Sequence, residues 1–383
     1  GHCYMWKTAS ILVGIALALM TLGIVMLAST SIIQGQSVFH DPNYFLKRQM
    51  IWLVIGAVAA AITSRIDYHI WRTFAVPLML VCVALLVLVL IPHVGTSVKG
   101  SSRWLRLGPV NFQPSELAKL SSVILLAWWM ARIQRRADEF KRGLFIPLGF
   151  LGVILMLIFV EPDFGTTMLI ALVGMTMMFV GGSRFSYLLV AGLLGFVAFG
   201  LAIMQNAERM RRITAFLNPE KYSQDEAFQL LNAIYAFVIG GGMGTGLGQG
   251  LQKRFYLPEA HTDFIFAIVG EEMGMLASLA VVALFIGFFL CGVRISFRAP
   301  DKFGKLLGFG ITLMITLQAA INIGVVTGCL PTKGLPLPFI SFGGSSLLIS
   351  LSMVGILINI ARQASAVMNS KDSNYIQDAS HRF

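Results

Sequence analysis

Long, uninterrupted apolar runs dominate this sequence of 383 residues. Each run has about 18 to 25 residues, the length that a helix needs to cross the ~30 Å hydrocarbon layer of a membrane. Hydrophobic residues make up 56% of the chain and charged residues 12%, whereas soluble domains carry about twice that charged fraction. We therefore predict an all-α integral membrane protein, a single polytopic domain over 1–383 whose ten transmembrane helices lie at about 10–33, 50–66, 73–92, 114–131, 144–160, 165–182, 186–205, 264–290, 305–328 and 345–361.

Basic residues cluster in two short predicted loops, 132–143 and 291–305. The positive-inside rule places both loops in the cytoplasm, and an even number of spans then places both termini there. The net charge of +11 fits such loops and anionic lipid better than a nucleic-acid partner. We expect the first run to be retained rather than removed as a signal peptide, because no small-residue cleavage site follows it. The cysteines show no spacing typical of a disulfide framework or a metal site: Cys3, Cys82, Cys291 and Cys329.

The opposite, outward side carries the long connections, at 34–49, 93–113, 206–263 and 329–344. Several basic residues fall in these loops, where the positive-inside rule does not place them. Either long loops escape the rule, or outward cations meet an anionic ligand, and the pattern leaves both readings open. These residues are Lys99, Arg103, Arg106, Lys253, Arg254 and Lys333.

The densest polar signal in apolar surroundings runs from Tyr256 to Phe266. We predict that Thr262 caps the span 264–290 and that Asp263 lies in its first turn, at the positive end of the helix dipole. A carboxylate at the mouth of a span is costly unless it is solvated or paired, so Asp263 and the nearby His261 indicate a functional site more than a simple cap.

Glu271 and Glu272 follow Asp263 in the same predicted helix. They lie roughly 12 Å deeper than Asp263, at ~1.5 Å of rise per residue, and Glu272 points to the opposite face. An acid/base dyad within this helix is therefore not expected, and we predict cationic or hydroxyl partners for both residues in the bundle.

A second charged pair, Glu116 and Lys119, stands just inside the span that begins near Pro114. The two residues are three apart and so share a helix face. Charges at this depth usually face a cavity or the bundle interior rather than lipid. The preceding stretch, Lys99–Gly108, places cations beside a tryptophan, which suits either an interfacial belt with snorkelling basic residues or a surface for phosphate and sugar.

The stretch Leu330–Ser346 is apolar but contains three prolines and three glycines, so it cannot form a regular span. Irregular backbone at membrane depth must be buried in protein or line a watery cavity. We predict a re-entrant segment in which Lys333 is a candidate for binding an anion. Two further stretches carry less signal: Glu161–Thr166 is a hairpin at least as readily as a site, and Gly240–Gly250 lacks the context of a nucleotide loop and indicates flexible or close-packed backbone.

Together these stretches resemble the SEDS family (shape, elongation, division and sporulation) of bacterial cell-wall polymerases. The resembling motifs occur in the family's order between about residues 10 and 362. Ala260 favours the division branch over the elongation branch, which commonly has Arg there, and Phe342 replaces the usual Tyr conservatively. The motifs are KGSSRWLRLG, QPSELAKL, EPDFGT, LPEAHTDFIFAIVGEE and PTKGLPLPFISFGGSSL.

The resemblance implies a peptidoglycan glycosyltransferase of the bacterial cytoplasmic membrane. Such an enzyme joins lipid II units through inverting β-1,4 bonds and releases undecaprenyl pyrophosphate. The resemblance further implies that Asp263 is catalytic and that residues matching Glu116, Lys119, Arg103 and Lys333 line an outward cavity. From the same stretches we add His261, Lys99 and Ser341 as substrate-binding candidates.

The expected partners are a class B penicillin-binding protein and other membrane proteins of the division complex, with no nucleic acid. No cofactor is certain, and a divalent cation (Mg²⁺ or Mn²⁺) held partly by Asp263 is one way to offset the pyrophosphate charge. The sequence does not separate Asp263 as base from Asp263 as metal ligand. Three alternatives stay open: an elongation-type polymerase, a flippase for lipid-linked precursors, which the lack of a clear internal repeat weakens, and a non-catalytic scaffold.

Overall fold

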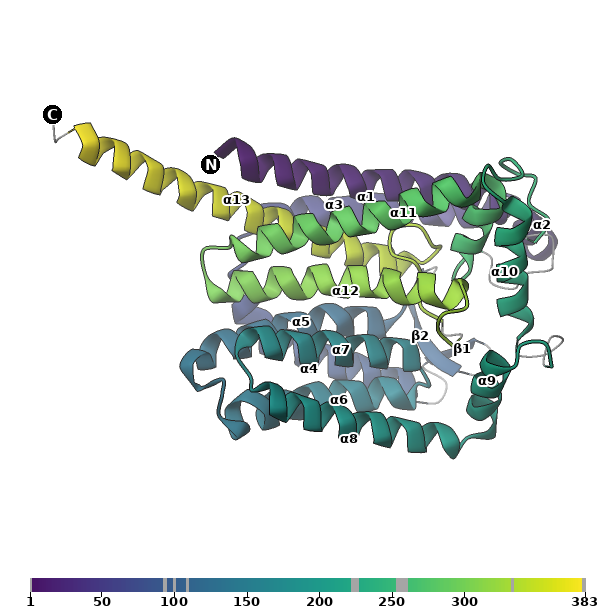
Figure 1. Cartoon of the computed structure of the whole chain (residues 1–383), viewed down its shortest axis with the longest axis horizontal. Coiled ribbons are helices and arrows are strands. Elements are labelled where there is room, and N and C mark those ends of the chain that lie inside the picture. Colours follow the sequence, from purple (N-terminus) through teal and green to yellow (C-terminus); the bar gives the residue numbers. More distant parts are fainter. Residues whose placement is uncertain are drawn as a thin grey trace.

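The computed structural model describes residues 2–91, 95–98, 101–107, 110–221, 227–252, 261–331 and 334–380. Its long helices lie side by side in one bundle (Figure 1). A small sheet and the helices α9 and α10 gather at one end of the bundle, and the last turns of α13 extend beyond the other end. We call the end that carries Asp263 the site end and the other the opposite end.

Long helices cover all ten of the predicted membrane runs. Their bounds are α1 His2–Thr30, α3 Tyr44–Arg65, α4 Ile70–Leu90, α5 Pro114–Ile133, α6 Ile146–Val160 with a preceding π-helical turn Phe140–Phe145, α7 Phe164–Gly181, α8 Phe185–Met204, α11 Ile265–Phe297, α12 Lys302–Val326 and α13 Gly344–Ser380. Nine of the helices in the described part of the chain are long and apolar enough to cross a membrane. The exception is α5, which keeps its polar residues inside: Ser115, Glu116, Lys119, Ser121 and Ser122 are all buried.

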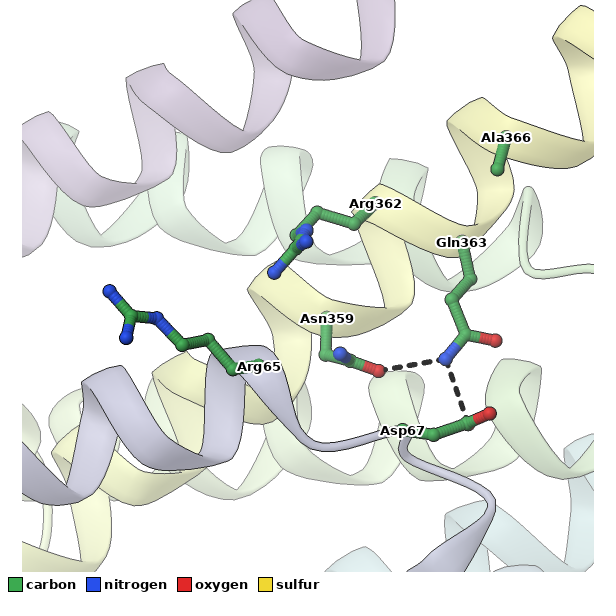
Figure 2. Close-up of a pocket in the computed structure, with 6 residues that line it drawn as sticks. All are labelled: Arg65, Asp67, Asn359, Arg362, Gln363 and Ala366. Atoms are coloured by element: carbon green, nitrogen blue, oxygen red, sulfur yellow. Dashed lines mark hydrogen bonds between the residues drawn. The ribbon is translucent and has the colours of Figure 1, made fainter.

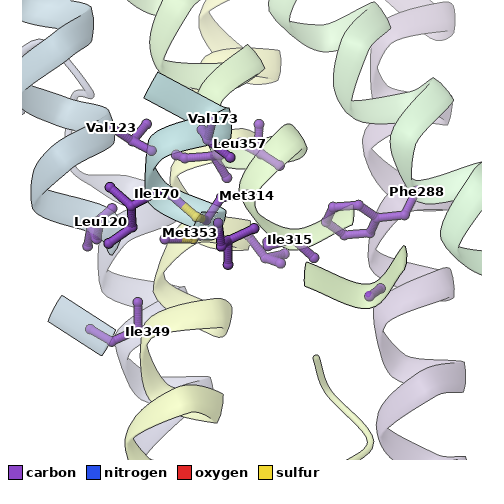
Figure 3. Close-up of a cluster of buried hydrophobic side chains, with 14 of the residues drawn as sticks. Leu120, Val123, Ile170, Val173, Phe288, Met314, Ile315, Ile349, Met353 and Leu357 are labelled. Atoms are coloured by element: carbon purple, nitrogen blue, oxygen red, sulfur yellow. The ribbon is translucent and has the colours of Figure 1, made fainter. Parts of the chain in front are cut away.

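The core lies where α5, α7, α12 and α13 meet. In Figure 3, Leu120 and Val123 of α5 face Ile170 and Val173 of α7, with Met314 of α12 between them and the side chains of α13. Burial falls steeply away from this core. In the most apolar 18-residue stretch of α13, 89% of the residues are buried, whereas in that of α8 only 6% are buried. The outer helices therefore present most of their apolar surface outward, as expected where lipid is the solvent.

The predicted all-α membrane fold is confirmed, and the structure adds one small sheet to it. The connection at 93–113 contains three antiparallel strands in the order β1-β2-β3, with bounds Gly95–Val98, Ser101–Leu107 and Val110–Phe112. Two of the other long connections contain helices: α2 (Ile32–Phe39) at 34–49, and α9 (Ala207–Leu217) and α10 (Phe228–Gly240) at 206–263. Backbone polar groups near a membrane need partners, and these elements supply them within each connection.

The stretch after α12 is irregular and buried, as the prolines and glycines predict. Leu335, Leu337 and Ile340 are each about 1% exposed, and Phe339 adopts a left-handed conformation with φ of 67°. On α1, a Cβ atom at Gly23 would lie 2.8 Å from the main chain of Ile340, so only glycine lets α1 approach this closely. Protein thus surrounds this re-entrant segment, which we define as residues 330–343, with Thr332 and Lys333 outside the described residues.

Candidate active site

Asp263 lies just before α11, against the re-entrant segment. Its Oδ2 atom lies 3.0 Å from the position that a Cβ atom on Gly334 would occupy. The predicted start of this span, at 264, differs by one residue from the start of α11 at Ile265, but the predicted cap was wrong: the N-cap is Phe264, and no side chain caps the helix. Asp263 therefore stands in a turn above the helix rather than in its first turn, and Thr262 is not its cap.

Asn322 of α12 holds Asp263 and the re-entrant segment together. Its Nδ2 donates to the main-chain oxygen of Asp263 at 2.8 Å and to that of Leu335 at 2.6 Å. Asn322 is buried, and its Oδ1 has no hydrogen-bond partner among the described residues. One amide on a membrane helix thus fixes where the Asp263 turn meets the segment that contains Gly334.

Ser341 and His261 make a second connection between the same two segments. The Ser341 hydroxyl donates to the Thr262 carbonyl at 2.6 Å and accepts from the Leu337 amide at 2.8 Å, while the Phe342 amide donates to the His261 carbonyl at 3.0 Å. The His261 ring packs against the rings of Phe45 and Phe342, with centroids at 4.7 and 5.9 Å, and these two rings also contact each other. Both residues were predicted to bind substrate, and the structure also gives each a part in holding Asp263 in place.

Glu116 and Lys119 form a buried ion pair, 2.7 Å between Oε2 and Nζ, with side chains only 4% and 3% exposed. The prediction that they share a face and avoid lipid is confirmed. The Lys119 ammonium also donates to Gln318 Oε1 at 2.8 Å, and Gln318 Nε2 donates to the Pro336 carbonyl at 2.8 Å. The pair is therefore linked through α12 to the re-entrant segment beside Asp263.

Arg103 reaches from β2 to the turn between α6 and α7. Its Nε and Nη2 donate to the main-chain oxygens of Glu161 and Pro162, at 3.0 and 2.6 Å. Asp163 caps α7 by accepting from the Thr166 amide at 3.2 Å. A Cβ atom on Gly165, in the first turn of α7, would lie 2.9 Å from the Leu335 side chain. The turn is therefore packed on the re-entrant segment and is more than an isolated hairpin.

The Glu161 carboxyl is 1% exposed, and neither oxygen has a hydrogen-bond partner among the described residues. Burial raises the pKa of this carboxyl to about 8; the nearby Asp163 charge adds to the shift and Arg103 opposes it. Glu161 is therefore largely protonated at neutral pH. This protonation state could not be predicted from the sequence, because it depends on the surroundings that the tertiary fold creates.

Glu271 and Glu272 fasten a glycine-rich loop, residues 241–252, to a break in α11. At Gly274 the helix is interrupted, with φ of 79° and ψ of −175°. The main-chain oxygens of Glu271 and Glu272 accept from the amides of Thr245 and Gly246 at 2.9 and 3.0 Å. The close-packed backbone predicted for this stretch is thus found.

The two carboxylates bind the same loop. Glu271 accepts from the amides of Leu251 and Gln252 at 2.7 and 3.2 Å, and Glu272 accepts from the Gly248 amide at 3.0 Å and from the Ser29 hydroxyl at 2.7 Å. A hydroxyl partner was predicted and is found for Glu272. The main-chain partners were missed, because sequence spacing does not show which loop returns to a helix.

Several sequence-predicted residues lie outside the described part of the chain: Lys99, Lys253, Arg254 and Lys333. Sequence reasoning also missed Asn322 and Gln318, whose signal was two amides four residues apart in an otherwise apolar span. Among the described residues, no group of three or more His, Cys, Asp or Glu side chains is placed to hold a metal ion. These residues therefore do not form a complete site for the divalent cation considered above, and we derive no step through it.

The site brings together residues from five stretches that are far apart in the sequence. The sequence pattern of the family described as a cell cycle protein, of the FtsW, RodA and SpoVE type, matches residues 9–366. The chain belongs to the FtsW/RodA/SpoVE family. The resemblance inferred from the motifs is thereby confirmed.

Relatives in the FtsW/RodA/SpoVE family cover nearly the whole chain. A protein of Trichlorobacter lovleyi named "Probable peptidoglycan glycosyltransferase FtsW" is 44% identical over 351 residues, 92% of each chain. A Geobacter sulfurreducens protein of the same name is 43% identical over 346 residues, 90% of this chain and 93% of the relative. Stage V sporulation protein E of Bacillus subtilis is 41% identical over 352 residues, 92% and 96% of the two chains.

Two solved structures of similar proteins share this fold. A chain from a structure described as a peptidoglycan synthase complex aligns with a TM-score of 0.77 at 26% identity, over 92% of this chain and 97% of that one. The rod shape determining protein RodA of Thermus thermophilus aligns with a TM-score of 0.68 at 25% identity, over 92% and 95%. The chain is 43–44% identical to the relatives named FtsW and 25% identical to RodA of Thermus thermophilus. This difference agrees with the division branch that Ala260 favours.

Proposed function

We propose that this chain is a peptidoglycan glycosyltransferase that polymerises lipid II during septal cell-wall synthesis, with Asp263 as its catalytic residue. The curated relatives named above carry the name of this activity. The observation that carries the assignment of the site is the connection of Asp263, through Asn322 and the re-entrant segment, to Gln318 and the buried Lys119. Buried polar groups joined in this way hold a reacting carboxylate in one position.

The proposed reaction is a single displacement with inversion. The 4-hydroxyl of the acceptor sugar attacks the anomeric carbon of the donor, the new C1–O4 bond forms, and the bond from C1 to the pyrophosphate oxygen breaks. Asp263 takes the hydroxyl proton and later releases it to water, while undecaprenyl pyrophosphate leaves with the bonding electron pair. A base within hydrogen-bond reach of the hydroxyl is the minimum that this step requires.

The developing charge on the pyrophosphate needs a cation. Lys119 is paired with Glu116 and Gln318, and Arg103 donates to the turn at Glu161 and Pro162, so both are already occupied within the protein. We assign them to positioning rather than to direct contact with the leaving group. Lys333 precedes Gly334, the glycine against which the Asp263 carboxylate lies, and we retain Lys333 as the proposed phosphate contact.

The proposed orientation places the site end outside the cytoplasm. The opposite end carries the basic residues that follow α5 and those that end α11, among them Arg135, Arg136, Arg294 and Arg298. The positive-inside rule then puts this end, with both termini, in the cytoplasm. A class B penicillin-binding protein is the proposed partner, since the product strands require cross-linking.

Purified lipid II and the purified full chain, with and without the partner, test the function. In detergent, the proposal predicts glycan strands several units long and release of undecaprenyl pyrophosphate. In lipid vesicles, movement of lipid II between leaflets without any polymer under either condition would favour a flippase and overturn the proposal.

A further inference from the structure

A small polar cavity lies at the opposite end of the bundle, remote from Asp263. Its volume is about 260 Å³, and it forms where the end of α3 meets α13 (Figure 2). It is lined by Arg65, Asp67, Asn359, Arg362, Gln363 and Ala366. The glycosyltransferase reaction proposed above uses none of these residues.

Hydrogen bonds between α13 and the end of α3 give the cavity a fixed wall. Asn359 is 4% exposed; its Nδ2 donates to the Ser64 carbonyl at 3.0 Å, and its Oδ1 accepts from the Tyr68 amide at 2.9 Å. Gln363 donates to Asp67 Oδ1 at 2.8 Å. The turn between α3 and α4 is therefore tied to α13, which fixes where the charged groups around it stand.

The cavity carries unequal charge, two arginines against one aspartate. Arg362 donates through Nη1 to the Ser64 carbonyl at 3.1 Å, so its other donors stay available. The Arg65 side chain makes no hydrogen bond or ion pair with any residue in the described part of the chain. In Figure 2 the two guanidinium groups lie on one side of Asn359, whereas the Asp67 carboxylate lies on the other, with Gln363. The arginine side of the cavity is thus open to an anion.

An exposed apolar stripe leads along α3 to this cavity. Ile55, Val58 and Ile62 are between 42% and 54% exposed and are spaced three or four residues apart, on one face of the helix. Ile66, the residue that follows the helix, is 36% exposed. The stripe ends beside Arg65, at the level where α3 leaves the membrane. An apolar track that ends at a pair of guanidinium groups matches one molecule of the bilayer, in which acyl chains are joined to a phosphate.

We propose that this cavity binds the phosphodiester headgroup of an anionic phospholipid, whose acyl chains lie along the α3 stripe. Arginine suits this ligand because its planar donors match phosphate oxygens in pairs. With the orientation proposed above, the site lies in the cytoplasmic leaflet, where anionic lipids attract basic groups. The proposal is independent of the chemistry at Asp263.

Binding of short-chain lipids to the purified full chain in a neutral detergent tests this site. The titrated probes are dioctanoyl phosphatidylglycerol, dioctanoyl phosphatidylcholine and glycerol 1-phosphate. The informative variant is Arg65→Gln, since its guanidinium bonds to no described residue and its loss should leave the fold intact. Arg72→Gln, an exposed arginine in the first turns of α4 at the same end, is the matched control.

We expect saturable binding of phosphatidylglycerol that is about tenfold weaker in Arg65→Gln and unchanged in Arg72→Gln, because a hydrogen bond between charged groups is lost only in the first. Phosphatidylcholine should bind more weakly than phosphatidylglycerol. Equal losses in the two variants, or equal binding of the two lipids, would overturn the site. Glycerol phosphate that binds as tightly as the lipid would overturn the lipid assignment in favour of a free phosphate ligand.

Discussion

Asn322 Nδ2 donates hydrogen bonds to the carbonyls of both Asp263 and Leu335, at 2.8 and 2.6 Å. This amide bonds Asp263 itself to the re-entrant segment that carries Gly334, beside the direct bonds from Ser341 to Thr262 and from Phe342 to His261. Position matters here, because a misplacement of about 1 Å lowers the rate of a displacement by about a hundredfold. The first prediction concerns this bond.

Asn322→Ala removes both hydrogen bonds and leaves two carbonyls near the site without this donor. We expect polymerisation to fall by at least tenfold, with a loss of about 1–2 kcal/mol in stability, the range for a hydrogen bond between membrane helices. Thr316→Ala is the matched control, since its hydroxyl bonds only to Thr312 of the same helix. Glycan synthesis that is equal in the two variants would remove Asn322 from the account.

The buried pair of Glu116 and Lys119 predicts a pattern of rescue. Lys119→Met leaves a buried carboxylate without its partner, at a cost of about 3–5 kcal/mol, and the Tm in detergent should fall accordingly. The double variant that also carries Glu116→Gln should recover most of the lost Tm. A double variant that melts no higher than Lys119→Met would contradict this pairing.

Glu161 predicts a stability that depends on pH. Its folded-state pKa is raised to about 8 from the ordinary value of 4.5, so the folded chain holds a proton that the unfolded chain releases. Stability contributed by this proton is complete below pH 4.5 and is lost as the pH rises towards 8. Glu161→Gln should therefore raise the Tm more at pH 8 than at pH 5. Glu139→Gln, a half-exposed carboxylate, is the control and should show no such trend.

Gly274 predicts that the break in α11 requires glycine. A Cβ atom there would lie 2.5 Å from the Gly242 carbonyl oxygen, and φ of 79° is unfavourable for alanine. We expect Gly274→Ala to lower the Tm clearly. Gly152→Ala, in the interior of α6 with nothing within 4 Å of its Cβ position, should be neutral or slightly stabilising. Equal melting temperatures for both variants would mean that the break has no role in stability.

Features set by local spacing could be predicted from the sequence. The apolar runs gave the ten helices, the three-residue spacing gave the face shared by Glu116 and Lys119, and three prolines gave the irregular re-entrant segment. Features set by tertiary contacts could not. The partners of Glu271 come from a loop about twenty residues away, and the roles of Asn322 and Gln318 exist only once α12 lies against residues 335–336. The small sheet escaped notice because β1 and β3 have only four and three residues, and because β2 contains two serines and two arginines.

The most direct test of the central claim is polymerisation of purified lipid II by Asp263→Asn. Asparagine keeps the size of the side chain and loses its basicity, so the account predicts a folded variant with wild-type melting behaviour and no glycan strands. Asp138→Asn, an exposed carboxylate at the opposite end, should polymerise normally. Glycan synthesis by Asp263→Asn at a rate close to that of the wild type would contradict the catalytic assignment.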